Sequence, residues 1–470
     1  MTRTAAIIGG GVIGGGWAAR FLLNGWDVRI FDPDPAAHRK IGEVLENGRR
    51  ALPMLYDCAM PAEGRLSFHD SIADAVKGAA WIQESVPERL ELKRKVFQTL
   101  QAHCAAGVVI GSSTSGFKPS ELQGCATRPE DIIVTHPFNP VYLMPLIEVV
   151  GTDRNDPALL DRAKQTLRGL GLHPLHVRRE IDAHIADRLM EAVWREGLWL
   201  VKDGIATTAE IDDAIRYSFG LRWAQMGLFE VFRIAGGEAG MRHFIEQFGP
   251  ALQWPWTKLM DVPELTDELV DMIAEQSDAQ SGHLSIRDLE RKRDGNLIAM
   301  MRALKQQGNA AGRLILDHQD TLRHLPAMAD PLVSQNRVVP VDWTDMNGHM
   351  NEGRYGQIFS DAAEEVMALV GADDDYVARG FSYFTVETTV KYLAETHAGE
   401  RVEVHSRVVE GAGKKLRCVH EMKRLEDGEI MATCDQLMLH VSLETRRTCD
   451  PPEDVADRVA ALAALHGRKG

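Results

Sequence analysis

Residues Thr4–Asp32 read TAAIIGGGVIGGGWAARFLLNGWDVRIFD. An apolar run, Ala5–Ile8, leads into a G-x-G-x-x-G string at Gly9–Gly14, and a helical pattern follows. A second apolar run, Val28–Phe31, ends in Asp32, 18 residues beyond the last glycine of that string. The glycine string alone is a weak signal. In the order strand, loop, helix, strand and acidic residue, however, it predicts a dinucleotide-binding unit.

Each part of this loop has a physical role in holding a pyrophosphate. Gly9 permits the tight turn, Gly11 lets the backbone approach the charge at the helix N-terminus, and Gly14 allows helix and strand to pack closely. Asp32 is expected to accept hydrogen bonds from an adenosine ribose and to repel a 2′-phosphate, which favours NAD over NADP. The predicted NAD-binding residues are Gly9, Gly10, Gly11, Val12, Ile13, Gly14 and Asp32. A glycine-rich turn without a ligand, with Asp32 as a strand-end cap, is the alternative.

Composition bounds the class of protein. The chain has 470 residues, 44% of them hydrophobic, which suggests about three folding units. Its 53 Lys and Arg against 68 Asp and Glu give a net charge of −15, so neither nucleic acid nor an anionic membrane is an expected partner. The six scattered cysteines indicate neither a disulfide framework nor a metal site. No apolar stretch approaches the ~20 residues that cross a bilayer, so we expect a cytoplasmic protein.

Secondary-structure patterns divide the chain into blocks. Over residues 1–181, short Val/Ile-rich runs alternate with helix-length segments, which predicts a mainly parallel, doubly wound α/β sheet that binds NAD. Residues 182–324 show helical periodicity only and predict an all-α domain for substrate binding and dimerisation. Residues 325–334 are expected to be a linker. Residues 335–447 show one helix followed by long alternating segments, which predicts an α+β domain. Residues 448–470 are expected to form a tail with a surface helix.

A carboxylate interrupts one of the predicted strands. Glu148 lies within the apolar run Leu146–Val150, where an unpaired charge is costly. His136, 12 residues earlier, is the natural partner, because a carboxylate fixes the tautomer of an imidazole and raises its basicity. Ser115 and Asn139 follow predicted strands and are expected to hold the alcohol oxygen or the cofactor. Downstream of a dinucleotide loop, this set favours oxidation of an alcohol. A strand-end histidine, an edge glutamate and an ordinary turn are the alternative.

Two short strings carry a family resemblance. HPFNP at residues 136–140 and ESVPE at residues 84–88 resemble the 3-hydroxyacyl-CoA dehydrogenase family, over residues 1 to about 320. The resemblance implies a Rossmann domain, a His136–Glu148 catalytic pair and Ser115 near the substrate hydroxyl. It also implies that Glu88 and Lys93 lie beside NAD, and that the protein is a homodimer.

One departure from that family concerns the substrate. The family has an Asn-Arg-Leu string where this chain has Asp187, Arg188 and Leu189, and a carboxylate near the reacting alcohol suits a cation. The helical block also holds five of the nine tryptophans, Trp194, Trp199, Trp223, Trp254 and Trp256.

Aromatic faces beside a carboxylate bind quaternary ammonium groups. We therefore expect Asp187, Trp194 and Trp223 to bind substrate, whereas helical packing or a dimer interface is the alternative for each aromatic. The strings WREGLWLVKDGIATTAEIDDAI (194–215) and RWAQMG (222–227) resemble family members that oxidise L-carnitine to 3-dehydrocarnitine.

The third block carries a separate motif, VDWTDMNGHMNEGRY, at residues 341–355. It resembles the hotdog thioesterases of the 4-hydroxybenzoyl-CoA type, over about residues 335 to 445. That resemblance implies Asp345 as the base or nucleophile at the thioester, with Asn347 and His349 orienting water and substrate. Amides at the start of the helix can polarise the thioester carbonyl. The fused arrangement implies an acyl-CoA substrate, betainyl-CoA. A hotdog domain kept for dimerisation is the alternative.

Three further questions stay open in the sequence. The whole chain is also compatible with an ordinary 3-hydroxyacyl-CoA dehydrogenase carrying a hotdog domain. It is compatible as well with a scaffold that binds a dinucleotide without catalysing a reaction. A basic cluster either receives CoA phosphates or is a solvated hairpin face; its members are Lys414, Lys415, Arg417, Lys423 and Arg424.

Overall fold

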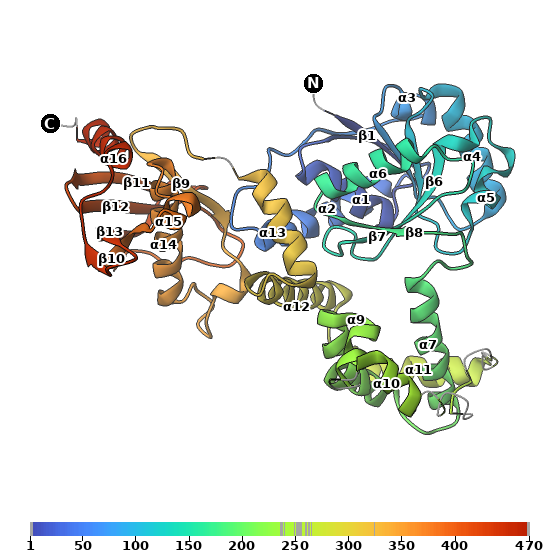
Figure 1. The fold of residues 1–470 in the computed structure, drawn as a ribbon. Helices are drawn as coiled ribbons and strands as arrows, with labels where there is room; N and C mark the ends of the chain where they lie inside the picture. Colours follow the sequence, from blue (N-terminus) through green and yellow to red (C-terminus); the bar gives the residue numbers. More distant parts are fainter. Residues whose placement is uncertain are drawn as a thin grey trace. The chain divides into compact units, whose positions relative to one another are not determined.

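The chain folds into two compact units in a computed structural model (Figure 1). The first unit holds Met1–Gly48 and Glu63–Leu316, and the second holds Arg49–Ala62 and Asp317–Gly470. The structure describes residues 3–235, 238, 240–248, 250, 256–258, 261, 264, 266–323 and 325–467. The domain boundary predicted at residue 324 and the last three residues of the predicted tail lie outside the described residues.

An eight-stranded sheet forms the centre of the first unit, in the order β3-β2-β1-β4-β5-β6-β7-β8. Its neighbouring strands are parallel except for the antiparallel pair β6 and β7. The strands are β1 (Thr4–Ile8), β2 (Asp27–Phe31), β3 (Leu66–Phe68), β4 (Trp81–Glu84), β5 (Val109–Ser112), β6 (Ile132–Pro137), β7 (Leu146–Val150) and β8 (His173–Val177). The predicted doubly wound sheet is confirmed. The three-residue β3 was not predicted, because so short a run carries little pattern.

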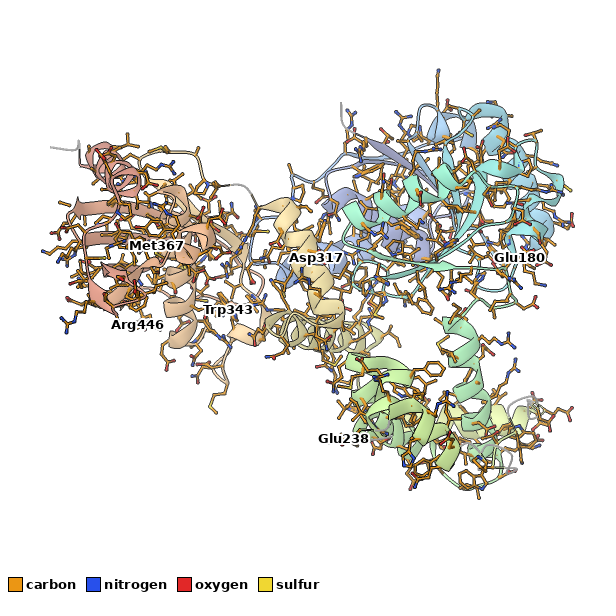
Figure 2. All side chains as sticks on the ribbon, in the orientation of Figure 1. Glu180, Glu238, Asp317, Trp343, Met367 and Arg446 are labelled. Carbon is orange, nitrogen blue, oxygen red and sulfur yellow. The ribbon has the colours of Figure 1, made fainter. Side chains whose placement is uncertain are left out.

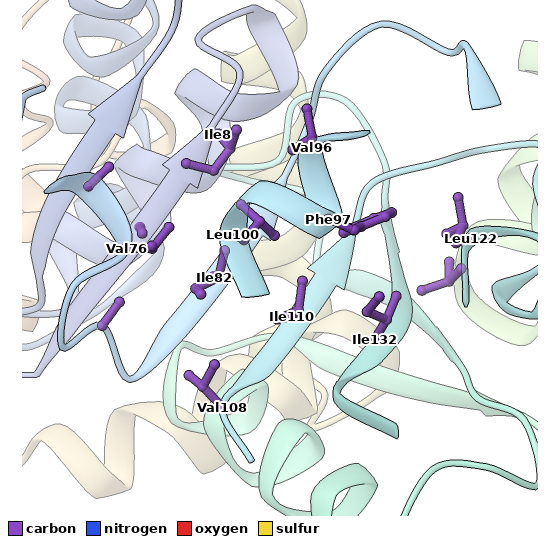
Figure 3. Close-up of a cluster of buried hydrophobic side chains, with 14 of the residues drawn as sticks. Ile8, Val76, Ile82, Val96, Phe97, Leu100, Val108, Ile110, Leu122 and Ile132 are labelled. Atoms are coloured by element: carbon purple, nitrogen blue, oxygen red, sulfur yellow. The ribbon is translucent and has the colours of Figure 1, made fainter. Parts of the chain in front are cut away.

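Helices cover this sheet, which explains why its strands read as continuous apolar runs. They are α1 (Val12–Leu23), α2 (Ala37–Ala51), α3 (Ile72–Val76), α4 (Leu90–His103), α5 (Pro119–Leu122) and α6 (Pro157–Gly169). Figure 3 shows one buried cluster, in which Ile82 and Ile110 of the strands lie with Phe97 and Leu100 of α4, all 0% exposed. This packing holds the strand ends, and the loops that follow them, in place.

The predicted all-α block is also confirmed, since the described residues between 182 and 323 contain helices and no strand. The helices are α7 (Ala186–Lys202), α8 (Thr208–Ala214), α9 (Gly220–Ala235), α10 (Gly240–Phe248), α11 (Asp267–Ser281), α12 (Ile286–Gln306) and α13 (Ala310–Leu322). Many of their side chains stand out into solvent (Figure 2), including the apolar Leu189, Met190, Tyr217 and Phe229.

The second unit is the predicted α+β hotdog fold, which is confirmed. Its sheet has the antiparallel order β10-β13-β12-β11-β9, with β14 paired to β13. Helix α14 buries Ile358, Phe359 and Val366 in the two hydrophobic clusters that it shares with the sheet. The elements are β9 (Leu332–Val338), α14 (Glu352–Leu369), α15 (Asp374–Ala378), β10 (Phe381–Tyr392), β11 (Arg401–Ala412), β12 (Lys415–Arg424), β13 (Ile430–Ser442), β14 (Arg447–Thr448) and α16 (Glu453–His466).

One expectation for this region was wrong. Strand β9 begins at Leu332, inside the predicted linker 325–334, and it pairs with β11 although its sequence has no continuous apolar pattern. The predicted surface helix of the tail is α16, which exposes Asp457 and Arg458 and buries Val455, Val459 and Leu462 in the core that α14 also enters. An amphipathic pattern shows that one helix face is covered, but not how deeply.

A short segment from the N-terminal part of the sequence belongs to the second unit. The Tyr56 hydroxyl lies 2.8 Å from Nδ1 of His318, and the backbone N–H of Asp57 donates to Gln319. The buried Arg337 guanidinium lies 2.7 Å from Asp361 and 3.6 Å from Asp57. A buried cation needs such partners, so residues 49–62 are part of the packing of this unit.

Candidate active sites

A cavity of about 660 Å³ opens where the strand order of the first sheet reverses, between β1 and β4. Ligands of doubly wound sheets bind at this switch point, beyond the carboxyl ends of the strands. Its wall includes the predicted Gly9, Gly10, Gly11 and Asp32, together with Ser85, Val86 and Pro87 after β4.

The residues at this cavity fit a dinucleotide. A Cβ on Gly14 would lie 1.8 Å from the carbonyl oxygen of Gly9, so only glycine allows this turn, whereas the Cα of Gly11 faces open space. Helix α1 begins beside it at Val12 with no acidic residue in its first turn, which leaves its N-terminus free to meet a pyrophosphate. Asp32 accepts hydrogen bonds from the backbone N–H groups of Gly10 and Asp34, which hold its carboxylate at the end of β2.

Six predicted cofactor residues are not among the described residues that line this cavity: Val12, Ile13, Gly14, Glu88, Lys93 and Asn139. Lys93 is 1% exposed, and its ammonium lies 2.9 Å from Glu84 and 3.2 Å from Glu88. Burial raises the pKa of Glu88, but the hydrogen bond from Thr114 and the charge of Lys93 outweigh it and leave the pKa below its usual value. Lys93 thus pairs with the buried carboxylate of Glu84 and with Glu88, whose side chain is 44% exposed.

The antiparallel register of β6 and β7 places His136 directly opposite Glu148. Nδ1 of the buried imidazole lies 3.0 Å from Oε2 of the carboxylate. The other oxygen, Oε1, accepts hydrogen bonds from the backbone N–H groups of Ile185 and Ala186, at the start of α7. Burial alone would raise the pKa of Glu148, but these hydrogen bonds, led by that of His136, keep it below its usual value. Glu148 is therefore ionised, and Nδ1 of His136 carries a proton.

The second nitrogen of His136 faces two of the other predicted residues. Nε2 lies 3.2 Å from the Ser115 hydroxyl and 3.5 Å from Oδ2 of Asp187. Burial raises the pKa of Asp187 above its ordinary value. With Nδ1 protonated, Nε2 is the basic nitrogen, so a basic nitrogen, a hydroxyl and a carboxylate converge on one point. This arrangement can accept a proton from an alcohol next to a cationic group.

Sequence reasoning missed His184, which is fully buried with its backbone in the left-handed region at φ +50°. Its Nε2 lies 3.3 Å from the carbonyl oxygen of Thr114, and its ring centroid lies 5.4 Å from that of His136. Burial, and then the charge of His136, lower the pKa of His184, which keeps it neutral. No periodic pattern in the sequence identifies His184 as a site residue. The one available signal was its closeness in sequence to Asp187.

The predicted aromatic residues are not enclosed with Asp187 in the described chain. Trp194 is 62% exposed, and Trp223 is 37% exposed and lies against Phe219. Trp254 lies outside the described residues. A role for Trp194 and Trp223 in substrate binding therefore stays a prediction.

In the second unit, the predicted motif forms a tight turn before α14. The backbone N–H of Asn347 donates to the Asp345 carboxylate, and Gly348 takes φ +85°. Asp345 and His349 line a cavity of about 370 Å³ that also reaches Glu352, in the first turn of α14. Asn347 is exposed and is not among the described residues of its wall. The turn therefore brings a carboxylate and an imidazole, but not the amide, to this cavity.

The basic cluster is largely neutralised by neighbouring carboxylates. Arg417 pairs with Asp435 at 2.7 Å, Lys415 with Glu410 at 3.1 Å, and Arg424 with Glu429 at 2.9 Å. This favours a solvated hairpin face over a phosphate site. Among the described residues, no group of His, Cys, Asp and Glu is arranged to hold a metal ion. None of the described helices combines the length and hydropathy needed to cross a bilayer.

Three family models together match most of the chain. The model of the 3-hydroxyacyl-CoA dehydrogenase NAD binding domain matches residues 4–181, and that of the C-terminal domain of the same family matches residues 184–272. The model of the thioesterase-like superfamily matches residues 339–459.

Similar proteins extend over the full length. The L-carnitine dehydrogenase/betainyl-CoA thioesterase of Ruegeria pomeroyi is 61% identical, over 98% of this chain and 96% of the relative. The protein of the same name from Agrobacterium fabrum is 53% identical, over 95% and 92%. Among solved structures, 5-formyl-3-hydroxy-2-methylpyridine 4-carboxylic acid 5-dehydrogenase, an NAD+-dependent dismutase, is 27% identical with a TM-score of 0.54, over 65% of this chain and 99% of that one.

Proposed function

Because this chain belongs to the L-carnitine dehydrogenase/betainyl-CoA thioesterases, which join a 3-hydroxyacyl-CoA dehydrogenase to a thioesterase-like domain, we propose that it oxidises L-carnitine to 3-dehydrocarnitine and hydrolyses betainyl-CoA. The cofactor is NAD. The observation that carries the carnitine proposal is the Asp187 carboxylate, 3.5 Å from Nε2 of His136. It provides a negative charge for the trimethylammonium group of carnitine, which is one methylene away from the hydroxyl-bearing carbon.

The oxidation divides between cofactor and protein. NAD, when bound, supplies the acceptor for the hydride that leaves the hydroxyl-bearing carbon. Nε2 of His136 takes the hydroxyl proton, and the Ser115 hydroxyl holds the alcohol oxygen. Glu148 stabilises the imidazolium that results. The products are the ketone, NADH and the proton that His136 later releases. Trp194 and Trp223 contribute aromatic faces to the ammonium group.

The hydrolysis uses the second cavity. Asp345 takes a proton from a water molecule while the oxygen of that water attacks the thioester carbonyl carbon. His349 orients the reacting groups. The C–S bond then breaks and the thiol of CoA leaves with that proton, so the acyl group is released as a carboxylic acid, which ionises by losing its proton to water. Backbone N–H groups at the start of α14 stabilise the charge that develops on the carbonyl oxygen.

Asp187 also offers a test of substrate identity. We expect Asp187→Asn, which restores the amide of the wider family, to raise KM for L-carnitine about tenfold, with little change for 3-hydroxybutyrate, which has a carboxylate but no ammonium group. As the pH falls through the raised pKa of Asp187, the carboxylate is protonated and its attraction for the cation is lost. KM for carnitine should therefore rise more steeply toward acidic pH in the wild type than in the variant.

The assay follows NADH formation with L-carnitine, D-carnitine, 3-hydroxybutyrate and its CoA ester. An ordinary 3-hydroxyacyl-CoA dehydrogenase would prefer the CoA ester, and a scaffold would bind NAD without forming NADH. Either outcome would contradict the carnitine proposal.

We further propose that the enzyme is a homodimer. Strand β10 is a 12-residue edge of its sheet, and its Phe384 and Val386 are 41% and 55% exposed. Long apolar edges invite pairing with a second strand, and exposed apolar patches mark interfaces. Sedimentation should give twice the chain mass of 52.1 kDa; a single species of chain mass at micromolar concentration would contradict this proposal.

We place the enzyme in the cytoplasm, a reducing compartment. Its six cysteines are free thiols, and two of them, Cys418 and Cys434, are buried in the second unit. Free thiols throughout a chain fit a reducing environment. Fractionation of the native cells, followed by detection of the enzyme, measures this directly.

A further inference from the structure

The cavity at Asp345 carries more negative charge than hydrolysis needs. Three carboxylates line it, those of Asp345, Glu352 and Glu395, and its described wall holds no lysine or arginine. CoA brings its own phosphates, so such a wall repels that end of the substrate. The two carboxylates beyond Asp345 therefore suit a positively charged acyl end.

Two tyrosines form a corner of the same cavity. The rings of Tyr355 and Tyr392 meet edge to face, with centroids 5.2 Å apart and planes at 79°. Tyr355 is buried and its hydroxyl donates to the Thr396 hydroxyl at 3.1 Å, which fixes its ring. Tyr392 ends β10 at the mouth of the cavity and is 54% exposed. Aromatic faces attract cations that have no proton to donate.

Glu395 brings a carboxylate to the tyrosine corner. It follows Tyr392 by three residues, and all residues of Tyr392–Glu395 line the cavity. Its Oε1 lies 3.7 Å from Nε2 of His349, a loose contact that leaves the carboxylate 69% exposed. The cavity thus combines aromatic faces and a solvated carboxylate beside Asp345.

We propose that Tyr355, Tyr392, Glu352 and Glu395 form a subsite for a quaternary ammonium group on the acyl chain of the thioester. The inference rests on the proposed thioesterase function and identifies what selects its acyl group. In a betainyl thioester the ammonium nitrogen is two bonds from the carbonyl carbon. One small cavity can therefore hold the cation at the tyrosines and the carbonyl near Asp345.

The test compares two thioesters of one shape on the full chain: betainyl-CoA and 3,3-dimethylbutanoyl-CoA, in which carbon replaces the ammonium nitrogen. The kcat/KM for each thioester is divided by the rate of uncatalysed alkaline hydrolysis of the same thioester. This is needed because the ammonium group itself makes the carbonyl more electrophilic. We expect the wild type to favour the cation by about 30-fold or more, and Tyr392→Leu and Glu395→Gln each to reduce that preference about tenfold.

Matched variants distinguish the loss of a carboxylate charge or an aromatic ring from general damage to the fold. Tyr392→Phe keeps the aromatic face and should keep the preference within about threefold. Glu444→Gln removes a carboxylate from an exposed turn outside the cavity and should change neither rate. Thermal unfolding of each variant verifies that it is folded.

Two failures are distinguishable. A wild type that hydrolyses both thioesters equally, or variants that slow both equally, would overturn the subsite but leave the hydrolysis. A wild type that hydrolyses the neutral thioester but not betainyl-CoA, or neither of them, would overturn the proposed substrate and the subsite together.

Discussion

Replacing His136 by alanine is expected to lower kcat for NAD-dependent carnitine oxidation by about 10³-fold and to leave betainyl-CoA hydrolysis at the wild-type rate. The variant loses the nitrogen that faces Ser115 and Asp187, and with it the acceptor for the hydroxyl proton. It also leaves the buried Glu148 without its imidazole partner, although two backbone N–H groups still stabilise that carboxylate. The measurement is NADH absorbance under saturating NAD and carnitine.

His173→Ala is the matched control, because His173 is exposed on β8 of the same sheet. Its rate should equal that of the wild type. NAD affinity, measured by fluorescence titration, should be similar in both variants. If folded His136→Ala protein kept more than a tenth of the wild-type kcat, His136 would not be the proton acceptor.

Replacing Asp345 by alanine should produce the opposite pattern. Thioester hydrolysis is expected to fall about 10³-fold, because the carboxylate that takes the proton from water is lost, while carnitine oxidation stays unchanged. The carboxylate also accepts the backbone N–H of Asn347, so Asp345→Asn, which keeps an acceptor for that hydrogen bond, separates catalysis from the shape of the turn. Release of free CoA thiol measures the rate.

Asp457→Ala removes an exposed carboxylate from α16 and serves as the control. It should hydrolyse betainyl-CoA at the wild-type rate. If Asp345→Ala or His136→Ala abolished both activities in folded protein, the two-site proposal would be wrong.

Periodicity and motif spacing were sufficient to predict most of the fold. Buried parallel strands such as β1 contain continuous apolar runs, here Ala5–Ile8. The glycine string between that strand and the next helix forms a turn that, at Gly14, only glycine allows. The same reasoning failed at Leu332–Val338, a strand with buried polar residues that pairs with β11 where a linker was predicted.

The candidate sites likewise contain features that the sequence predicted and features that it did not. The charge of Glu148 inside an apolar run was enough to predict a partner, and the register of β6 and β7 places that partner opposite. No pattern marked His184, and none showed that Lys93 is buried with Glu84 rather than on the cofactor cavity. These features depend on contacts between segments that are distant in sequence.

The sequence by itself determined the three structural blocks and most of their strands and helices, the dinucleotide loop and the candidate residues for the chemistry. These depend on local backbone preferences and on which side chains avoid water. Only the tertiary structure decided that Asp187 faces Nε2 of His136, that Asn347 lies off the second cavity, and that Tyr355 meets Tyr392 there. The reason is that direction and distance between side chains arise when separate elements pack, and packing is a property of the whole unit.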